Sequence, residues 1–144
     1  MQVPQKKVLF LCTGNSCRSQ MAEAWVNSLR STEWLAFSAG IETHGMNPHA
    51  VSVMAESGVD MTKHYSKKLE DLGGQKFDLV VTVCGHAAEH CPAIPMNTLV
   101  KHVPFEDPPA LAKLAANEVE SLNSYRQVRD QIRSFIESSE LSCS

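Results

Sequence analysis

Residues 8–18 read Val8-Leu9-Phe10-Leu11-Cys12-Thr13-Gly14-Asn15-Ser16-Cys17-Arg18. The first four are apolar and too few for a helix, so they predict a short buried strand. Residues 12–16 are small and turn-forming, which indicates a loop. Beyond Ser19 the apolar residues recur every three or four positions and predict an amphipathic helix: Met21, Ala22, Trp25, Val26 and Leu29. The stretch therefore predicts a strand ending at Cys12, a tight loop, and a helix beginning at Arg18.

Such a loop is suited to bind a tetrahedral oxyanion. Inward-turned backbone N–H groups and the helix N-terminus attract negative charge, and the planar guanidinium of Arg18 can pair with two oxygens at once. The same positive field favours the thiolate of Cys12, which could then attack the bound anion. The alternative is a buried structural cysteine beside a solvent-facing arginine, but the strand–loop–helix context favours the functional interpretation. The predicted binding residues are Thr13, Gly14, Asn15, Ser16, Cys17, Arg18 and Ser19, with no catalytic role for Cys17.

The composition predicts a single domain spanning residues 1–144. A hydrophobic content of 43% and a charged content of 20% are ordinary for a globular protein. The net charge of −3 and the lack of a basic run argue against nucleic acid or an anionic membrane as partners. The apolar run after Lys6-Lys7 stops at Thr13, too short for a signal peptide or a membrane span. We therefore expect a cytoplasmic protein, whose five cysteines are better explained by chemistry than by a disulfide framework.

Strand and helix patterns alternate along the chain. Further strands are expected at 34–38, 77–84 and 98–103, and further helices at 49–57, near 110–114 and at 117–138. Nearly continuous apolar strands separated by helices predict an α/β fold: a single-domain, three-layer sandwich with a four-stranded parallel sheet flanked by helices. Ligands of such sheets bind beyond the carboxyl ends of the strands. Cys12 and Cys84 fall at such ends, and Asp107 follows the last strand.

Asp107 has two interpretations. Pro108 biases it toward extended backbone, and an acid on a loop beside the anion site could protonate a leaving oxygen. Locally, Asp107 is an equally good N-cap for the helix near 110–114.

Cys84 and Cys91 are seven residues apart. On a regular helix their Cα atoms would lie ~10 Å apart, whereas a disulfide needs about 7 Å or less. A bond between them would therefore require the segment to unwind, as in a conformational switch. Zinc bound by Cys84, His86, His90 and Cys91 is the competing interpretation, but the spacing matches no usual zinc motif, and we expect no metal. Four other histidines are expected to be ordinary surface or capping residues: His44, His49, His64 and His102.

The chain closely resembles the arsenate reductases built on the low-molecular-weight tyrosine phosphatase fold. The resemblance covers essentially the whole chain and rests on residues 12–23, 38–45, 47–48, 78–85, 91–92, 105–108 and 126–130. The pair Cys84/Cys91 is its specific part, because simple phosphatases of this fold lack that redox relay.

The resemblance implies a three-cysteine mechanism without a cofactor. Cys12 attacks arsenate, Asp107 protonates the departing oxygen, and Ser19 is the hydroxyl partner of the nucleophile. Cys84 then attacks the Cys12 adduct, arsenite leaves, and the Cys12–Cys84 disulfide passes to Cys84–Cys91. Thioredoxin or another thiol donor would reduce that bond. We expect the protein to be a monomer.

One position departs from the family pattern. Many relatives bind potassium near the loop through groups matching Asn15, Glu23 and Ser38, together with an aspartate at the position of Lys67. We therefore hypothesise that the Lys67 ammonium replaces the cation. Two other functions stay open: a phosphatase acting on phosphotyrosine or small esters, and a metalloid- or zinc-binding sensor without catalysis.

Overall fold

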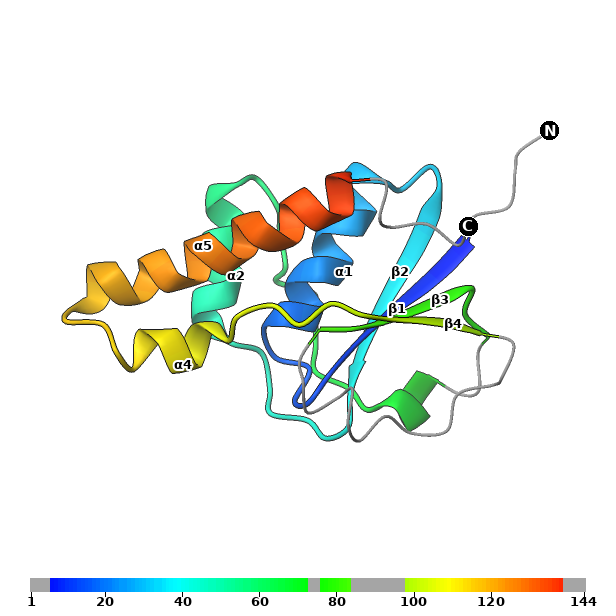
Figure 1. Cartoon of the computed structure of the whole chain (residues 1–144), viewed down its shortest axis with the longest axis horizontal. Coiled ribbons are helices and arrows are strands. Elements are labelled where there is room, and N and C mark those ends of the chain that lie inside the picture. The colour runs from blue at the N-terminus through cyan, green and yellow to red at the C-terminus, as the bar shows by residue number, and fades with distance from the viewer. Residues whose placement is uncertain (1–5, 73–75, 84–97, 139–144) are drawn as a thin grey trace.

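The computed structural model describes residues 6–72, 76–83 and 98–138. Four parallel strands form one sheet in the order β2-β1-β3-β4: β1 (Lys6–Cys12), β2 (Trp34–Gly40), β3 (Leu79–Thr82) and β4 (Leu99–His102). The helical elements are α1 (Arg18–Leu29), α2 (Pro48–Glu56), the 3₁₀ turn η1 (Leu69–Leu72), α4 (Pro108–Ala112) and α5 (Glu118–Glu137). Figure 1 shows the helices flanking the sheet, which confirms the predicted α/β class.

The central strands β1 and β3 are paired at both edges, and most of their side chains are buried. β1 lies between β2 and β3, and Val8 to Leu11 are at most 1% exposed. A strand covered on both faces is read as a continuous apolar run, as the sequence showed. β4 lies at the edge of the sheet, where Leu99 is 40% exposed. Within the described residues β3 covers only Leu79–Thr82 of the strand expected at 77–84.

Capping residues fix the starts of two helices. The side chain of Asn47 accepts hydrogen bonds from the N–H groups of His49 and Ala50, and Pro48 occupies the first turn of α2. Asn117 caps α5 by accepting from the N–H of Glu120. Both helices therefore begin where the sequence predicted. None of the described helices is both long and apolar enough to cross a membrane.

The apolar face expected for α1 is confirmed at Met21, Ala22, Trp25 and Val26, which are at most 1% exposed. This helix packs against β1 and β2 on one side and α5 on another, so polar Ser19 and Gln20 are as buried as Met21. Leu29, expected on the apolar face, is 37% exposed. Helix α1 thus carries buried polar groups next to the loop that precedes it.

Candidate active site

The loop between β1 and α1 is held by the segment that follows β2. The N–H groups of residues 41, 42, 44 and 47 donate to the carbonyl oxygens of Cys12, Thr13, Gly14 and Ser16, with N···O distances of 3.0–3.2 Å. In a trans peptide the N–H points opposite to the C=O. The following N–H groups of the loop therefore point away from this segment, as an oxyanion site requires.

Asn15 gives the loop its sharp turn. Its φ of 50° lies in the left-handed region, which asparagine tolerates better than most residues. Its buried amide Nδ2 donates to Ser19 Oγ at 2.9 Å, and its Oδ1 accepts from Gln20 Nε2 at 2.8 Å and from the N–H of Lys67 at 2.9 Å. The Asn15 side chain thus ties the loop to α1 and to the segment that carries Lys67. Ser19 takes part in this support, and its predicted contact with the nucleophile stays a prediction.

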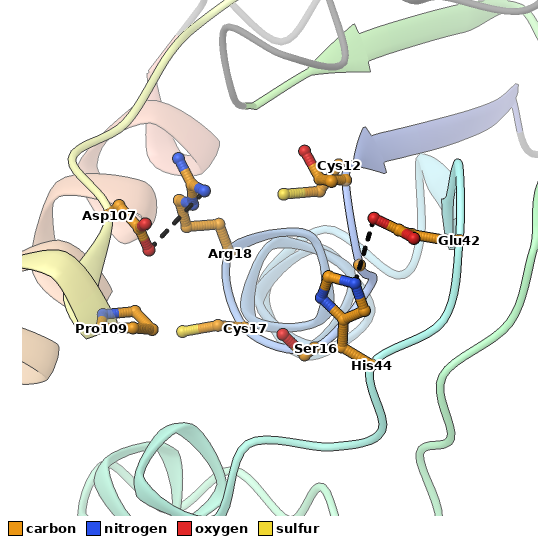
Figure 2. A pocket seen from close by; sticks show the side chains of 10 residues that line it. Cys12, Ser16, Cys17, Arg18, Glu42, His44, Asp107 and Pro109 are labelled. Atoms are coloured by element: carbon orange, nitrogen blue, oxygen red, sulfur yellow. Dashed lines mark ion pairs between the residues drawn. The ribbon is translucent and has the colours of Figure 1, made fainter.

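An open pocket of about 500 Å³ lies over the loop (Figure 2). It brings together Cys12, Arg18 and Asp107, three residues selected from separate parts of the sequence. The other lining residues are Thr13, Gly14, Ser16, Cys17, Glu42, His44 and Pro109. Cys12 is only 5% exposed. The pocket can therefore hold a small anion against a buried sulfur atom.

Arg18 links the two sides of this pocket. Its guanidinium lies 3.7 Å from Asp107 Oδ1 and donates to the carbonyl of Phe105 at 3.1 Å. Asp107 occupies the N-cap position of α4, yet its side chain makes no capping hydrogen bond. Its side chain is 46% exposed and lines the pocket. The geometry therefore favours a site role for Asp107 over the capping role.

Cys17 lies inside the pocket wall in a different electrostatic environment. Burial raises the pKa of its thiol to about 12, against a lowering effect of the Arg18 charge and a raising effect of Asp107. At neutral pH Cys17 is therefore a protonated thiol and a poor nucleophile. This agrees with its predicted place in the loop without a catalytic role.

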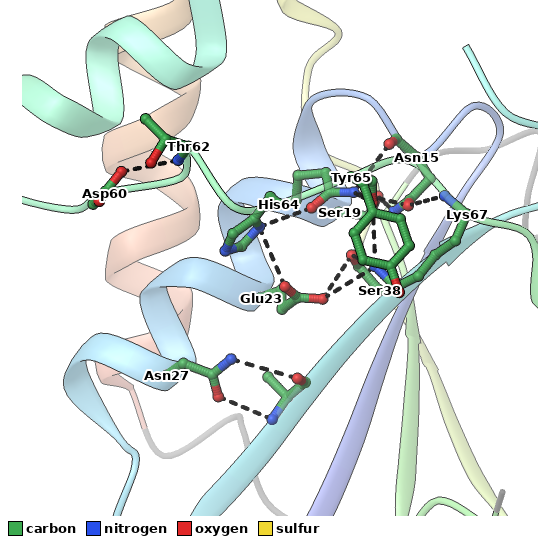
Figure 3. A network of polar contacts seen from close by, with 12 residues as sticks. Asn15, Ser19, Glu23, Asn27, Ser38, Asp60, Thr62, His64, Tyr65 and Lys67 are labelled. Atoms are coloured by element: carbon green, nitrogen blue, oxygen red, sulfur yellow. Dashed lines mark hydrogen bonds and ion pairs between the residues drawn. The ribbon is translucent and has the colours of Figure 1, made fainter. Parts of the chain in front are cut away.

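A network of polar side chains lies beneath the loop (Figure 3). The ammonium of Lys67 is 3.6 Å from Glu23 Oε1 and 3.4 Å from Ser38 Oγ, and Lys67 is only 9% exposed. The Ser38 hydroxyl donates to Glu23 at 2.9 Å. A cation already sits among the groups that would ligate potassium, so these residues do not fit the metal. The geometry supports the hypothesis that the Lys67 ammonium takes the place of a potassium ion.

The prediction for His64 is wrong. Its side chain is 17% exposed, and its Nδ1 lies 2.9 Å from Gln20 Oε1 and 3.2 Å from Glu23 Oε2. His44 is exposed but lines the pocket, which the sequence did not indicate. The sequence offered one indication of the His64 contact, the acidic Glu23 one turn after Gln20 on α1. No local sequence pattern indicates that His44 lines the pocket.

Several predicted residues lie outside the described part of the chain. These are Cys84, Cys91, His86, His90 and Cys143. The redox relay and the zinc alternative therefore both stay predictions. Within residues 6–72, 76–83 and 98–138, no group of three or more histidine, cysteine or acidic side chains is placed to hold a metal ion.

Comparison with known proteins agrees with this geometry. The arsenate reductase of Halalkalibacterium halodurans is 49% identical over 128 residues, 89% of this chain and 90% of that protein. A solved structure described as an arsenate reductase in the phosphate binding state matches with a TM-score of 0.74 and 30% identity, covering 92% and 95% of the two chains. The low molecular weight protein tyrosine phosphatase from T. tengcongensis matches with a TM-score of 0.72 and 28% identity, covering 92% and 96%. Residues 7–138 match the family model for low molecular weight phosphotyrosine protein phosphatase, and the chain belongs to this family.

Proposed function

We propose that this protein is an arsenate reductase that converts arsenate to arsenite by a thiol relay. The main observation in support is the pocket that brings together Cys12, Arg18 and Asp107, a nucleophile, an anion-binding group and an acid. The pocket alone suits any small tetrahedral oxyanion. The 49% identity with an arsenate reductase over most of both chains supports the reductase among the members of this family.

In the proposed first step the Cys12 thiolate forms a bond to arsenic. One arsenic–oxygen bond breaks, and Asp107 donates the proton with which that oxygen leaves as water. Arg18 pairs with the remaining oxygens and with the charge that develops on them. Its position within 3.7 Å of Asp107 supports joint action on one bound anion.

In the second step the Cys84 thiolate attacks the sulfur of Cys12. The sulfur–arsenic bond breaks and its electron pair stays on arsenic, which leaves as trivalent arsenite. The two thiols thereby become a Cys12–Cys84 disulfide, which accounts for both electrons. Cys91 then attacks Cys84 and releases the Cys12 thiolate. A dithiol donor such as thioredoxin would reduce the Cys84–Cys91 bond. We propose that the chain acts as a cytoplasmic, single-domain monomer.

Mass spectrometry of the fully reduced protein after arsenate treatment, without any reductant, tests this proposal. We expect a loss of two hydrogens per chain, mapped to Cys84 and Cys91, and one arsenite released. Cys12→Ser should abolish both results. Cys91→Ser should stop the relay at the Cys12–Cys84 bond, and Cys143→Ser serves as the matched control that should behave like the wild type.

The second candidate is a phosphatase, favoured by the family match and by a site that would serve phosphate esters unchanged. It predicts a protein that stays reduced with arsenate, hydrolyses a phosphate ester through Cys12, and is indifferent to Cys84→Ser. That combination would overturn the reductase proposal.

A further inference from the structure

We propose that His44 is a substrate-binding residue of the oxyanion pocket and that Glu42 positions its imidazole ring. The proposal rests on the proposed function only in requiring that the pocket binds an oxyanion. His44 and Glu42 both line the pocket. Figure 2 shows them on one side, Asp107 and Pro109 on the other, and Cys12 and Arg18 between.

The backbone of this wall is fixed to the anion loop. The N–H of Glu42 donates to the carbonyl of Thr13, and the N–H of His44 donates to the carbonyl of Gly14, both at 3.0 Å. The His44 side chain is 53% exposed, but its backbone is hydrogen-bonded to the anion loop. The side chain is therefore held at the edge of the oxyanion pocket that it lines.

The ring of His44 occupies the space that a side chain at Gly14 would need. A Cβ atom on Gly14 would lie 2.2 Å from His44 Nδ1 and 2.6 Å from Cγ, closer than atoms can approach. Gly14 is not among the residues with positive φ, so its backbone conformation does not demand glycine. Glycine at this position instead admits the imidazole against the loop.

The Glu42–His44 contact leaves one ring nitrogen for a ligand. His44 Nε2 lies 3.2 Å from Glu42 Oε1, and because a carboxylate only accepts hydrogen bonds, this contact favours the proton on Nε2. Nδ1, the ring atom nearest the position of a Cβ on Gly14, then accepts a hydrogen bond from a protonated oxygen when the ring is neutral and donates one when the ring is charged. An oxyanion bound by Arg18 next to Cys12 would have oxygens on both sides of the pocket. His44 would contact one of these oxygens and Asp107 another.

Titration of inorganic phosphate into the reduced protein, followed by calorimetry, tests this inference. His44→Phe keeps a flat ring against Gly14 but removes both nitrogens, and we expect the phosphate Kd to rise about 5- to 10-fold, as for the loss of one hydrogen bond of ordinary strength at a half-exposed side chain. Glu42→Gln should raise it about 2- to 3-fold. Glu70→Gln, an exposed glutamate paired with Lys68 away from the pocket, is the matched control and should leave it unchanged.

Kinetics and NMR separate ligand contact from a structural role. In His44→Phe the KM for arsenate should rise while kcat stays within about 2-fold. In the wild type, the ¹⁵N resonance of His44 Nδ1, assigned by its loss in His44→Phe, should shift when phosphate binds. An unchanged phosphate Kd in a folded His44→Phe variant, or an Nδ1 resonance of the wild type that does not shift with phosphate, would overturn the inference. Failure of arsenate to oxidise the protein would overturn the reductase proposal and leave the phosphate result intact.

Discussion

Two clusters of charged side chains use the same kinds of groups in different surroundings. The inner cluster, beneath the loop, comprises Glu23, Ser38, His64 and Lys67; the outer cluster, between α2 and α5, comprises Glu56, Arg126 and Arg129. Ion-pair distances are 3.2–3.6 Å in the inner cluster and 2.7–3.2 Å in the outer one. The ionisable side chains of the inner cluster are only 11–17% exposed, whereas in the outer cluster Glu56 is 40%, Arg126 33% and Arg129 13% exposed.

The shortest contact of the two clusters, Arg126–Glu56 at 2.7 Å, is therefore also the most solvated one. Exposed ion pairs contribute little to stability, because water and salt screen them. A buried charge that loses its partner is costly even when the original contact was long. The inner cluster also reaches the loop, since the Lys67 N–H donates to Asn15. Burial and connection, more than distance, should decide which cluster controls the site.

The largest effect is expected from Asn15→Ala, which breaks the link between the inner cluster and the loop. The substitution removes the partner of the buried Ser19 hydroxyl and of the Lys67 N–H, each at a cost of ~1–3 kcal/mol. Gln20 Nε2 loses one acceptor but keeps the carbonyl oxygens of residues 15 and 65. It also places alanine at a φ of 50°, which costs ~1–2 kcal/mol. We expect a loss of about 3 kcal/mol or more in urea denaturation, and no measurable phosphate binding.

Asn15→Gly separates the two causes. Glycine removes the conformational strain but not the lost hydrogen bonds, so it should recover only about 1 kcal/mol relative to alanine. If Asn15→Gly matched the wild type in both stability and phosphate affinity, the side-chain bonds of Asn15 would contribute nothing to the loop.

The next effect is expected from Lys67→Met in the inner cluster. The Glu23 carboxylate, 13% exposed, would lose its ammonium partner, and removal of one member of a buried pair costs roughly 3 kcal/mol. Glu23→Gln combined with Lys67→Met should recover part of this loss, measured as a coupling energy in a double-mutant cycle.

The same residue predicts how activity depends on potassium. Because the Lys67 ammonium already lies among Glu23, Ser38 and the carbonyl of Tyr65, exchange of sodium for potassium should leave wild-type turnover unchanged. Lys67→Asp should introduce a dependence on potassium. Clear potassium activation of the wild type in steady-state kinetics would contradict the replacement hypothesis.

The contrast also explains what the sequence could predict. Local patterns identified β1 and placed the ends of α2 and α5 within one residue, because apolar periodicity and capping residues act over a few positions. The arrangement of Cys12, Arg18 and Asp107 followed from the rule that parallel strands share one carboxyl edge.

The inner cluster was not predictable in the same way. The Gln20 amide donates to the carbonyl of Tyr65, 45 residues along the chain, and His64 contacts the same helix. Periodicity could not identify Gln20 as buried because it records only which residues are apolar. Which distant segment covers a polar face is decided by the tertiary fold.

The smallest effect is expected from Glu56→Gln in the outer cluster. Hydrogen bonds from Arg126 and Arg129 lower the pKa of Glu56 from 4.5 to about 2. Between these values the unfolded chain binds more protons at this residue than the folded one, so its contribution to stability is complete above pH ~5 and falls toward pH 2. The variant should therefore lose slightly less unfolding free energy on acidification from pH 5 to pH 3, measured by urea denaturation. Glu137→Gln, which breaks the single 3.5 Å pair of Arg133 on the same helix, is the matched control. An equal slope in wild type and Glu56→Gln would mean that Glu56 has the same pKa in the folded and the unfolded chain. Its short contacts with the two arginines would then add nothing to stability that depends on its charge.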